Sequence, residues 1–315
     1  MEERGQGTVE WVGLVAVVAL LLAALVVAGV RVPGAELARA VVSRMLCAVA
    51  MAERCGDEPR LIAAYGTEVG KLVRRHMPTL LFEQGSRALP VDFRRCRATA
   101  CADGSARGLV GETDAGLPVT AFVRVVDCRD RPGGSLPSSA GEAGVPGLDC
   151  SGPRAGNLYL QYWTYYPDSA TLRGVPIAEA AGYHRDDWES AQFRIGPDGR
   201  VAQRASSHHG YNHVRSLANA GSDAGLIPLR DAAEAVGARP RNGWGPETRL
   251  LVVSGGSHAG NANGFLRIDR IAPGRRVHLV PLESIVAAQG DAHGFAVSPP
   301  WRKRVWSDPE ASGTD

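Results

Sequence analysis

Eight consecutive residues, Gly182 to Glu189, form a dense cluster of side chains that could do chemistry. They include an imidazole, three carboxylates, a guanidinium and an indole, and a strand-like sequence follows at once. On a strand that begins at Asp187, side chains alternate, so Asp187 and Glu189 share one face and Trp188 points to the other. His184 precedes this strand, where a turn can fold its ring over both carboxylates. Imidazole and two carboxylates indicate a metal site, and the alternative is a solvated strand face with a simple ion pair.

The octapeptide resembles the hallmark Gly-His-Arg-His-Asp-Trp-Glu of the necrosis- and ethylene-inducing-peptide-like protein family. The aromatic segment 159–168 is similar to the strand that precedes this hallmark in the family. By this resemblance the metal ligands are Asp168, His184, Asp187 and Glu189. Many oxygen donors favour Mg²⁺, Ca²⁺ or Mn²⁺ over Zn²⁺.

The resemblance has two departures and three further matches. Asp186 stands where the family has its second histidine, and Tyr183 stands where it has glycine, so membrane damage of the family's kind is not implied. Downstream, Ser207–Tyr211 is similar to a segment of the same family. Leu251–Ala259 resembles a Gly-Ser-His-Ala strand end of a vacuolar-sorting-associated family, whose members also tend to end in an element like Pro299–Trp301. The residues expected around the ligands are Arg185, His208, Ser257 and His258.

A hairpin turn is expected at Gly196–Gly199, between two strand-like segments. The returning strand brings His208 and His209 back to the Asp187 end, where at most one of them can join the site, because neighbouring strand residues face opposite sides. The strand 248–254 is followed by Gly-x-Ser-x-Ala, which resembles the Gly-x-Ser-x-Gly pattern of a nucleophile elbow and would make Ser257 a nucleophile. However, residues 260–264 are rich in Gly and Asn and cannot start the helix that an elbow requires.

The N-terminus predicts a membrane anchor. Residues 11–30 are twenty uncharged, mostly aliphatic residues, enough to cross a bilayer as a helix. Residues 4–10 resemble the class III leader of type IV pilin-like proteins, with cleavage after Gly5 and Glu10 at the fifth mature position. A plain anchor or a cleaved signal peptide are the alternatives. We expect a single-pass plasma-membrane protein with its C-terminal part outside the cytoplasm.

The six cysteines agree with export, because an even number in an extracytoplasmic chain indicates disulfides. Pairing of sequence neighbours is expected, although six cysteines allow fifteen pairings. The predicted pairs are Cys47–Cys55, Cys96–Cys101 and Cys128–Cys150.

Composition and patterning predict a mainly β protein. The net charge of +2 over 315 residues gives no electrostatic case for binding nucleic acid. After the leader and anchor at 1–31, residues 32–77 form a helical stalk or cap of two short helices, 35–54 and 59–76. Residues 78–310 form an antiparallel β-sandwich, and 311–315 form a disordered tail after an extended segment from 299. Its expected strands are 79–83, 89–93, 117–128, 159–167, 187–195, 201–206, 248–254, 265–268 and 277–280.

The sequence supports three main functions, besides a weaker one, a metal-free glycoside hydrolase that uses Asp187 and Glu189. The first is a surface-displayed binding module whose divalent metal, by the family resemblance, contacts a sugar or lipid head group. The second is a metal-dependent hydrolase in which Asp186 or His209 moves protons. The third is a pilus-associated structural subunit. Whether the protein is an enzyme is left open at this point.

Overall fold

The computed structural model describes residues 58–129, 150–170, 183–207, 210–213, 243–263, 267–282, 285 and 294–311. The chain divides into two compact units, residues 1–71 and 72–315, and all candidate site residues belong to the second. The predicted leader, anchor, first stalk helix and Cys47–Cys55 pair lie outside the described residues. Within the described ranges, no helix is long and apolar enough to span a membrane.

Helix α3 (Glu58–His76) agrees with the second predicted helix and is interrupted at Gly66, which has a φ of 78°. The described strands are β1 (Thr79–Glu83), β2 (Gly108–Leu109), β3 (Thr120–Asp127), β4 (Leu158–Ala170), β5 (Tyr183–Ile195), β6 (Val201–Ser207), β7 (Gly210–Asn212), β8 (Gly245–Pro246), β9 (Leu250–Val253), β10 (Gly260–Asn261), β11 (Ile268–Ala272) and β12 (His278–Pro281). The described short helices are α4 (Thr99–Ala102), η1 (Gly152–Arg154), η3 (Gly274–Arg276), η4 (Pro300–Arg302) and α8 (Arg304–Ser307).

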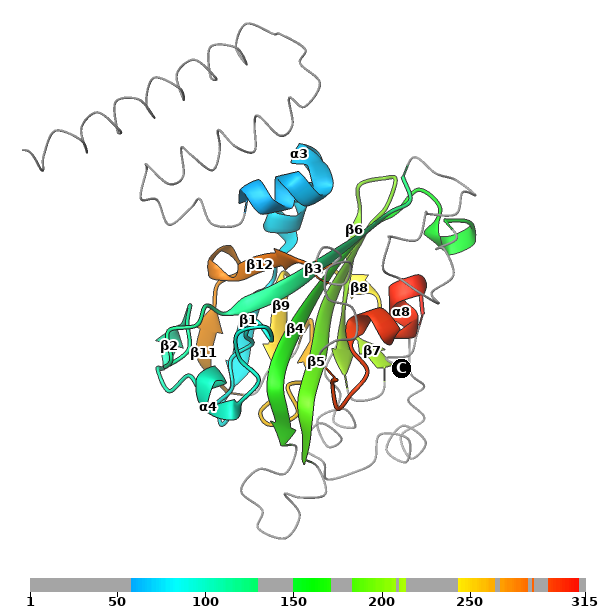
Figure 1. The fold of residues 1–315 in the computed structure, drawn as a ribbon. Coiled ribbons are helices and arrows are strands. Elements are labelled where there is room, and N and C mark those ends of the chain that lie inside the picture. Colours follow the sequence, from blue (N-terminus) through cyan, green and yellow to red (C-terminus); the bar gives the residue numbers. More distant parts are fainter. Residues whose placement is uncertain are drawn as a thin grey trace, which may run out of the picture. The chain divides into compact units, whose positions relative to one another are not determined.

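The strands form two sheets, so the prediction of a mainly β protein is confirmed (Figure 1). One sheet has five strands in the order β10-β9-β1-β11-β2. The other has seven strands, of which six follow the order β12-β3-β4-β5-β6-β7 and the seventh, β8, pairs with β6 off this path. Most of the strand pairs are antiparallel as predicted, but both sheets are mixed, because β1 pairs with β9, β11 with β2, and β12 with β3 in parallel. In each of these three pairs the two strands lie far apart in the sequence. The long connection between them allows the second strand to run in the same direction as the first.

The predicted strand at 89–93 is absent, and the segment turns instead. The Asp92 carboxylate accepts the backbone N–H of Arg94 at 3.0 Å, and its carbonyl accepts the N–H of Cys96 at 3.0 Å. Such local bonds from an aspartate compete with strand pairing. The segment keeps two backbone bonds to the sheet, from the N–H of Val91 to the carbonyl of Tyr165 and from the N–H of Thr120 to the carbonyl of Pro90.

The alternation predicted for β5 is confirmed. Cross-strand pairing sets Trp188 opposite Tyr165, whereas Asp187 lies opposite Tyr166 on the other face. The Trp188 face carries a buried aromatic cluster, in which Phe93, Phe122, Tyr165, Phe295 and Trp301 lie with ring centroids within 6.1 Å of the indole.

The C-terminal segment covers this same face of the seven-stranded sheet, although the sequence predicted an extended tail from residue 299. Helix α8 lies over the central strands (Figure 1), where the Val305 carbonyl accepts a hydrogen bond from Gln161 Nε2 at 3.1 Å. Trp306 is fully buried beneath the Arg124 guanidinium, 3.5 Å from its ring centroid. Burial of Trp306 therefore holds the segment to the sheet. Residues 312–315 of the predicted disordered tail lie outside the described part of the chain.

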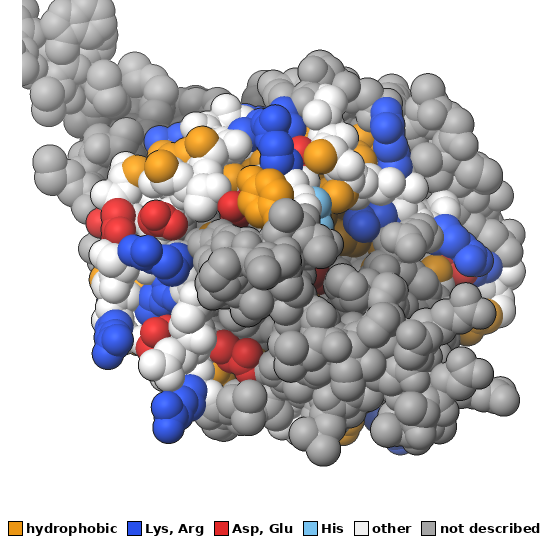
Figure 2. Space-filling model, turned by 90° about the horizontal axis from the view of Figure 1, so that it is seen from below, with side chains coloured by type: hydrophobic (Ala, Val, Ile, Leu, Met, Phe, Trp, Pro, Cys, Tyr) orange, Lys and Arg blue, Asp and Glu red, His pale blue; other side chains and the backbone are white. Residues whose placement is uncertain are grey.

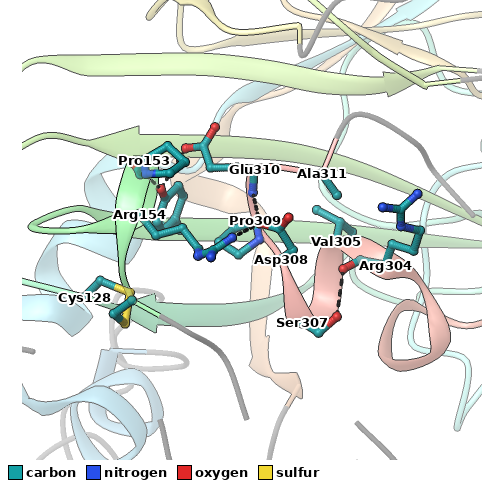
Figure 3. Close-up of polar contacts among 12 residues, drawn as sticks. Cys128, Pro153, Arg154, Arg304, Val305, Ser307, Asp308, Pro309, Glu310 and Ala311 are labelled. Atoms are coloured by element: carbon teal, nitrogen blue, oxygen red, sulfur yellow. Dashed lines mark hydrogen bonds and ion pairs between the residues drawn. A yellow bond between two sulfur atoms is a disulfide. The ribbon is translucent and has the colours of Figure 1, made fainter. Parts of the chain in front are cut away.

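A second group of contacts holds the segment further along the chain. Figure 3 shows part of it, around Arg154, Asp308 and Glu310, with the Cys128 disulfide nearby. Arg154 Nη1 donates to Asp308 Oδ1 at 2.9 Å. Glu310 accepts hydrogen bonds from the Tyr159 hydroxyl at 2.7 Å, from Arg194 Nη1 at 3.0 Å and from the Trp244 indole at 3.0 Å. The C-terminal segment is thus an integral layer of the domain.

Candidate functional site

Four carboxylates lie at the end of the sheet where β4 finishes and β5 begins. Asp168, Asp186, Asp187 and Glu189 are between 2% and 9% exposed. Figure 2 views the domain toward this end and shows hydrophobic, histidine and Lys or Arg side chains side by side. Burying a carboxylate costs free energy unless hydrogen bonds or a cation compensate it, so the partners of each one decide what this end can do.

Asp187 is paired with His258, which lies between β9 and β10. His258 Nδ1 is 2.9 Å from Asp187 Oδ2, and both side chains are buried. The imidazole also stacks on Tyr166, with ring centroids 4.0 Å apart and planes 4° apart. Burial raises the pKa of the Tyr166 hydroxyl far above its ordinary value, and the nearby carboxylates Asp187 and Glu189 add to the increase. The neutral tyrosine and the carboxylate together fix the orientation of the imidazole.

Glu189 lies on the same face of β5 and is held by β6. Its Oε2 accepts a hydrogen bond from Ser206 Oγ at 2.6 Å, and the same hydroxyl accepts the N–H of Ser190 at 2.5 Å. A glycine on β10 permits the close approach of the two sheets here, because a Cβ on Gly260 would lie 3.2 Å from Ala205 Cβ. Glu189 is therefore part of the interior between the sheets.

Asp186 points to the opposite face and is surrounded by donors. It accepts hydrogen bonds from the Tyr165 hydroxyl at 2.5 Å, from Arg97 Nη2 at 3.0 and 3.1 Å, and from the N–H of Ala296 at 2.8 Å. Burial alone would raise the pKa of Asp186, but these hydrogen bonds and the Arg97 charge outweigh it and hold the pKa below its ordinary value. A general acid needs the opposite shift, so these surroundings suit Asp186 to a structural role and not to proton transfer.

Replacing Asp186 with asparagine is expected to change the pH dependence of stability. Because the pKa is lower in the folded state, the carboxylate adds stability above about pH 4, which is lost as pH falls through the folded pKa. The difference in unfolding free energy between wild type and Asp186→Asn should therefore shrink in acid. Urea denaturation across this pH range measures it, and a difference independent of pH would contradict the expectation. Asparagine tolerates the left-handed backbone at this position, where φ is 58°.

The two remaining predicted ligands, Asp168 and His184, contact a hydroxyl group and a backbone carbonyl. Asp168 Oδ2 accepts a hydrogen bond from Thr99 Oγ1 at 2.9 Å, and His184, which is exposed, has Nδ1 3.0 Å from the Asp186 carbonyl. In the parts of the chain that the structure describes, no three His, Cys, Asp or Glu side chains gather in a way that could hold a metal ion. The donor types suit Mg²⁺, Ca²⁺ or Mn²⁺, but their arrangement does not fit one.

Backbone strain concentrates at this end. The non-glycine residues with positive φ, within the described ranges, are Asp186, His258 and Arg249. Two of the three are site residues, and each such conformation costs about 1 kcal/mol or more unless its surroundings impose it. The hydrogen bonds of Asp186 and the Asp187 contact of His258 supply that compensation.

The other predicted neighbours are placed as follows. Arg185 is exposed and pairs across the strands with Asp168. Ser257 is buried, and no helix follows it, since the chain continues into β10; a nucleophile elbow is therefore absent at this position. His208 and His209 lie outside the described residues.

Arg97 and Thr99 were not predicted from the sequence, although they contact two of the four carboxylates. They are far from β4 and β5 along the chain, so no local pattern connects them. One signal was present: both lie between Cys96 and Cys101, which were expected to pair and do pair. The Cys128–Cys150 pair is also confirmed.

No protein-family model matches the chain, and no curated protein matches it. The solved structures that it resembles include NLPPya, a necrosis- and ethylene-inducing peptide 1-like protein, in complex with glucosamine. That match has 15% sequence identity and a TM-score of 0.34, and covers 76% of this chain and 87% of the other. NLPPya in complex with mannosamine matches with 15% identity and a TM-score of 0.35, and covers 76% and 86%. These scores are too low to transfer a site or a ligand.

Proposed function

We propose that this protein is a membrane-anchored, extracytoplasmic binding module whose ligand is a hydroxyl-rich group, a glycan or a lipid head group. The ligand would bind at the β4–β5 end. The observation that carries this proposal is the set of four buried carboxylates next to three consecutive exposed residues, Tyr183, His184 and Arg185. The exposed histidine and arginine side chains can hydrogen-bond hydroxyl groups, and the exposed tyrosine ring offers an apolar surface for a sugar ring, while the buried carboxylates hold the strand that carries all three.

Two features support a preformed site. The Asp187–His258–Tyr166 contacts hold an imidazole in one orientation, and the strained backbone at Asp186 and His258 fixes the chain on both sides of it. Such preorganisation reduces the entropy that a ligand must overcome. The anchor rests on the apolar run 11–30, and export agrees with the two disulfides, which persist in oxidising compartments.

A metal-dependent hydrolase is the weaker alternative. The Asp187–His258 pair has the carboxylate–imidazole form of a general base, which is the observation in its favour. However, the low pKa of Asp186 argues against one of its two proposed proton carriers. A bound divalent ion stays a prediction of the sequence.

Asp187→Asn is expected to weaken ligand binding by tenfold or more, on the order of one lost charge-assisted hydrogen bond. The full-length protein in detergent would be tested by calorimetry against soluble oligosaccharides and against vesicles that carry glycosylated lipids, which separates the two sources of the ligand. Asp198→Asn is the matched control, because Asp198 lies in the exposed β5–β6 turn, at the other end of β5. Equal affinity in all three proteins, or no binding by wild type, would contradict the proposal.

The same samples test the ion by elemental analysis. If the sequence prediction is right, wild type retains Mg²⁺, Ca²⁺ or Mn²⁺ after dialysis, and the Asp187→Ala, Glu189→Ala double variant loses it. Equal metal content in both proteins would contradict the predicted metal site and would leave metal-independent binding as the proposal.

A further inference from the structure

The loop closed by Cys96–Cys101 lies against both strands of the β4–β5 end. The disulfide joins Cα atoms 6.1 Å apart and encloses Arg97, Ala98, Thr99 and Ala100. Two of these four residues reach the candidate site. Arg97 Nη2 donates to both carboxylate oxygens of Asp186, and Thr99 Oγ1 donates to Asp168 Oδ2.

Inside the disulfide ring, the loop has little helical structure to hold its shape. Helix α4 has four residues, and its N-cap, Ala98, makes no side-chain cap. A single helical turn is unstable by itself, because few hydrogen bonds offset the ordering of its backbone. The backbone is held on both sides of the loop, by the bond from the Cys96 N–H to the Asp92 carbonyl and by the bond from the Leu89 N–H to the Ala102 carbonyl at 2.8 Å. The disulfide is therefore the restraint that acts on the four residues between these two anchors. A short covalent ring removes most of the open conformations that Arg97 and Thr99 would otherwise adopt.

The hydrogen bonds from Arg97 and Thr99 compensate the burial of the Asp186 and Asp168 carboxylates. Asp168 and Asp186 are 4% and 2% exposed, and a buried carboxylate that loses a donor leaves an acceptor without compensation. Arg97 also lies over the Phe295 ring, 4.9 Å from its centroid, and the next residue, Ala296, donates its N–H to Asp186. Displacement of Arg97 would therefore disturb β5 and the segment at 295–296 together.

We propose that Cys96–Cys101 is the positioning element of the β4–β5 end, and that Arg97 and Thr99 are positioning residues which set the carboxylates of Asp186 and Asp168. The proposal deepens the proposed function, on which its ligand-binding consequence rests. Without the disulfide, this end of the hairpin opens while the rest of the sheet stays closed. The site is then complete only after the chain has reached an oxidising compartment.

Hydrogen exchange of the full-length protein tests the structural part without any ligand. The Cys96→Ser, Cys101→Ser variant is expected to raise exchange in the strand segments 165–170 and 183–189 by about tenfold or more, with little change in 193–204. Cys128→Ser, Cys150→Ser is the matched control, because that disulfide packs with Val126, Tyr159 and Trp244 at the far end of β4. This control variant should raise exchange first near Tyr159, at the beginning of β4. The proposal would be overturned if the two double variants changed exchange equally at 165–170 and 183–189. It would also be overturned if exchange at 183–189 stayed unchanged in the Cys96→Ser, Cys101→Ser variant.

Ligand affinity provides the second readout. Thr99→Ala should weaken oligosaccharide binding by about fivefold, and Thr99→Ser, which keeps the hydroxyl, should restore it. A merely structural role would not distinguish these two small substitutions. Equal affinity of Thr99→Ala and wild type would overturn the role of Thr99. If wild type binds no glycan, the proposed function fails, but the exchange experiment still decides whether the disulfide sets the carboxylates.

Discussion

Replacement of Arg204 by methionine is expected to lower the free energy of unfolding by about 3 to 5 kcal/mol. Arg204 lies on β6 and is fully buried. Its guanidinium donates to Gln192 Oε1 at 3.0 Å and to the carbonyls of Ala311 and Pro309 at 2.9 and 2.6 Å. Methionine fills much of the volume but leaves these buried acceptors without donors, and the C-terminal segment loses its attachment to β6.

Burial lowers the pKa of Arg204 to about 10, so the side chain stays charged at neutral pH. Its charge is partly compensated by stacking on Tyr211 and Trp244, with distances of 4.0 and 4.3 Å from the guanidinium carbon to the ring centroids. Arg194→Met is the control, since Arg194 contacts Glu310 and Trp244 on the same face but is half-exposed, and its loss should cost about 1 kcal/mol. Urea denaturation and limited proteolysis measure both. Equal destabilisation by the two substitutions would refute this role of Arg204.

Trp188→Ala is expected to cost about 3 to 5 kcal/mol, because it removes the centre of the aromatic cluster. The indole is 4% exposed and lies 5.1 Å from the Tyr165 ring and 5.5 Å from the Phe93 ring, measured between centroids. Alanine leaves a cavity that these rings, fixed on rigid strands and turns, cannot fill. The neighbouring Asp187 faces the other side of the sheet, so the loss should appear in stability before it appears in the Asp187–His258 contact.

Trp188→Phe separates volume from polarity. The indole N–H has no hydrogen-bond partner within the described residues, so phenylalanine removes volume without leaving an acceptor unsatisfied. We expect it to cost about 1 to 2 kcal/mol, well below the alanine variant. Thermal and urea unfolding of the three proteins provide the comparison. A phenylalanine variant as unstable as the alanine variant would mean that the indole N–H has a partner after all.

Local patterns predicted the central hairpin correctly. A strand has a period of two, so the order Asp187-Trp188-Glu189 is sufficient to assign the indole and the carboxylates to opposite faces. The Gly196–Gly199 turn was also predicted from the sequence. In the structure the Gly199 N–H donates to the Gly196 carbonyl at 2.9 Å. Both features depend on residues that are close together in the sequence.

The parts that could not be predicted depend on contacts between distant residues. The tail that begins at Pro299 contains charged residues and looked extended, yet Trp306 is fully buried under Arg124. Arg97 could not be predicted as a site residue, because only folding brings its side chain to Asp186. The metal site stays a prediction. Within the described residues, the Glu189, Asp187 and Asp168 side chains contact different partners, which are Ser206, His258 and Thr99.

The position of β1 within its sheet has a consequence for how the chain folds. Its two neighbours, β9 and β11, come from the last third of the sequence, with Thr79 aligned to Leu250 and Leu80 aligned to Ala272. During synthesis β1 therefore emerges long before either partner, and both of its edges stay open with Leu80 and Phe82 uncovered. Closure of this sheet must therefore follow synthesis of both partner strands, most of the way along the chain.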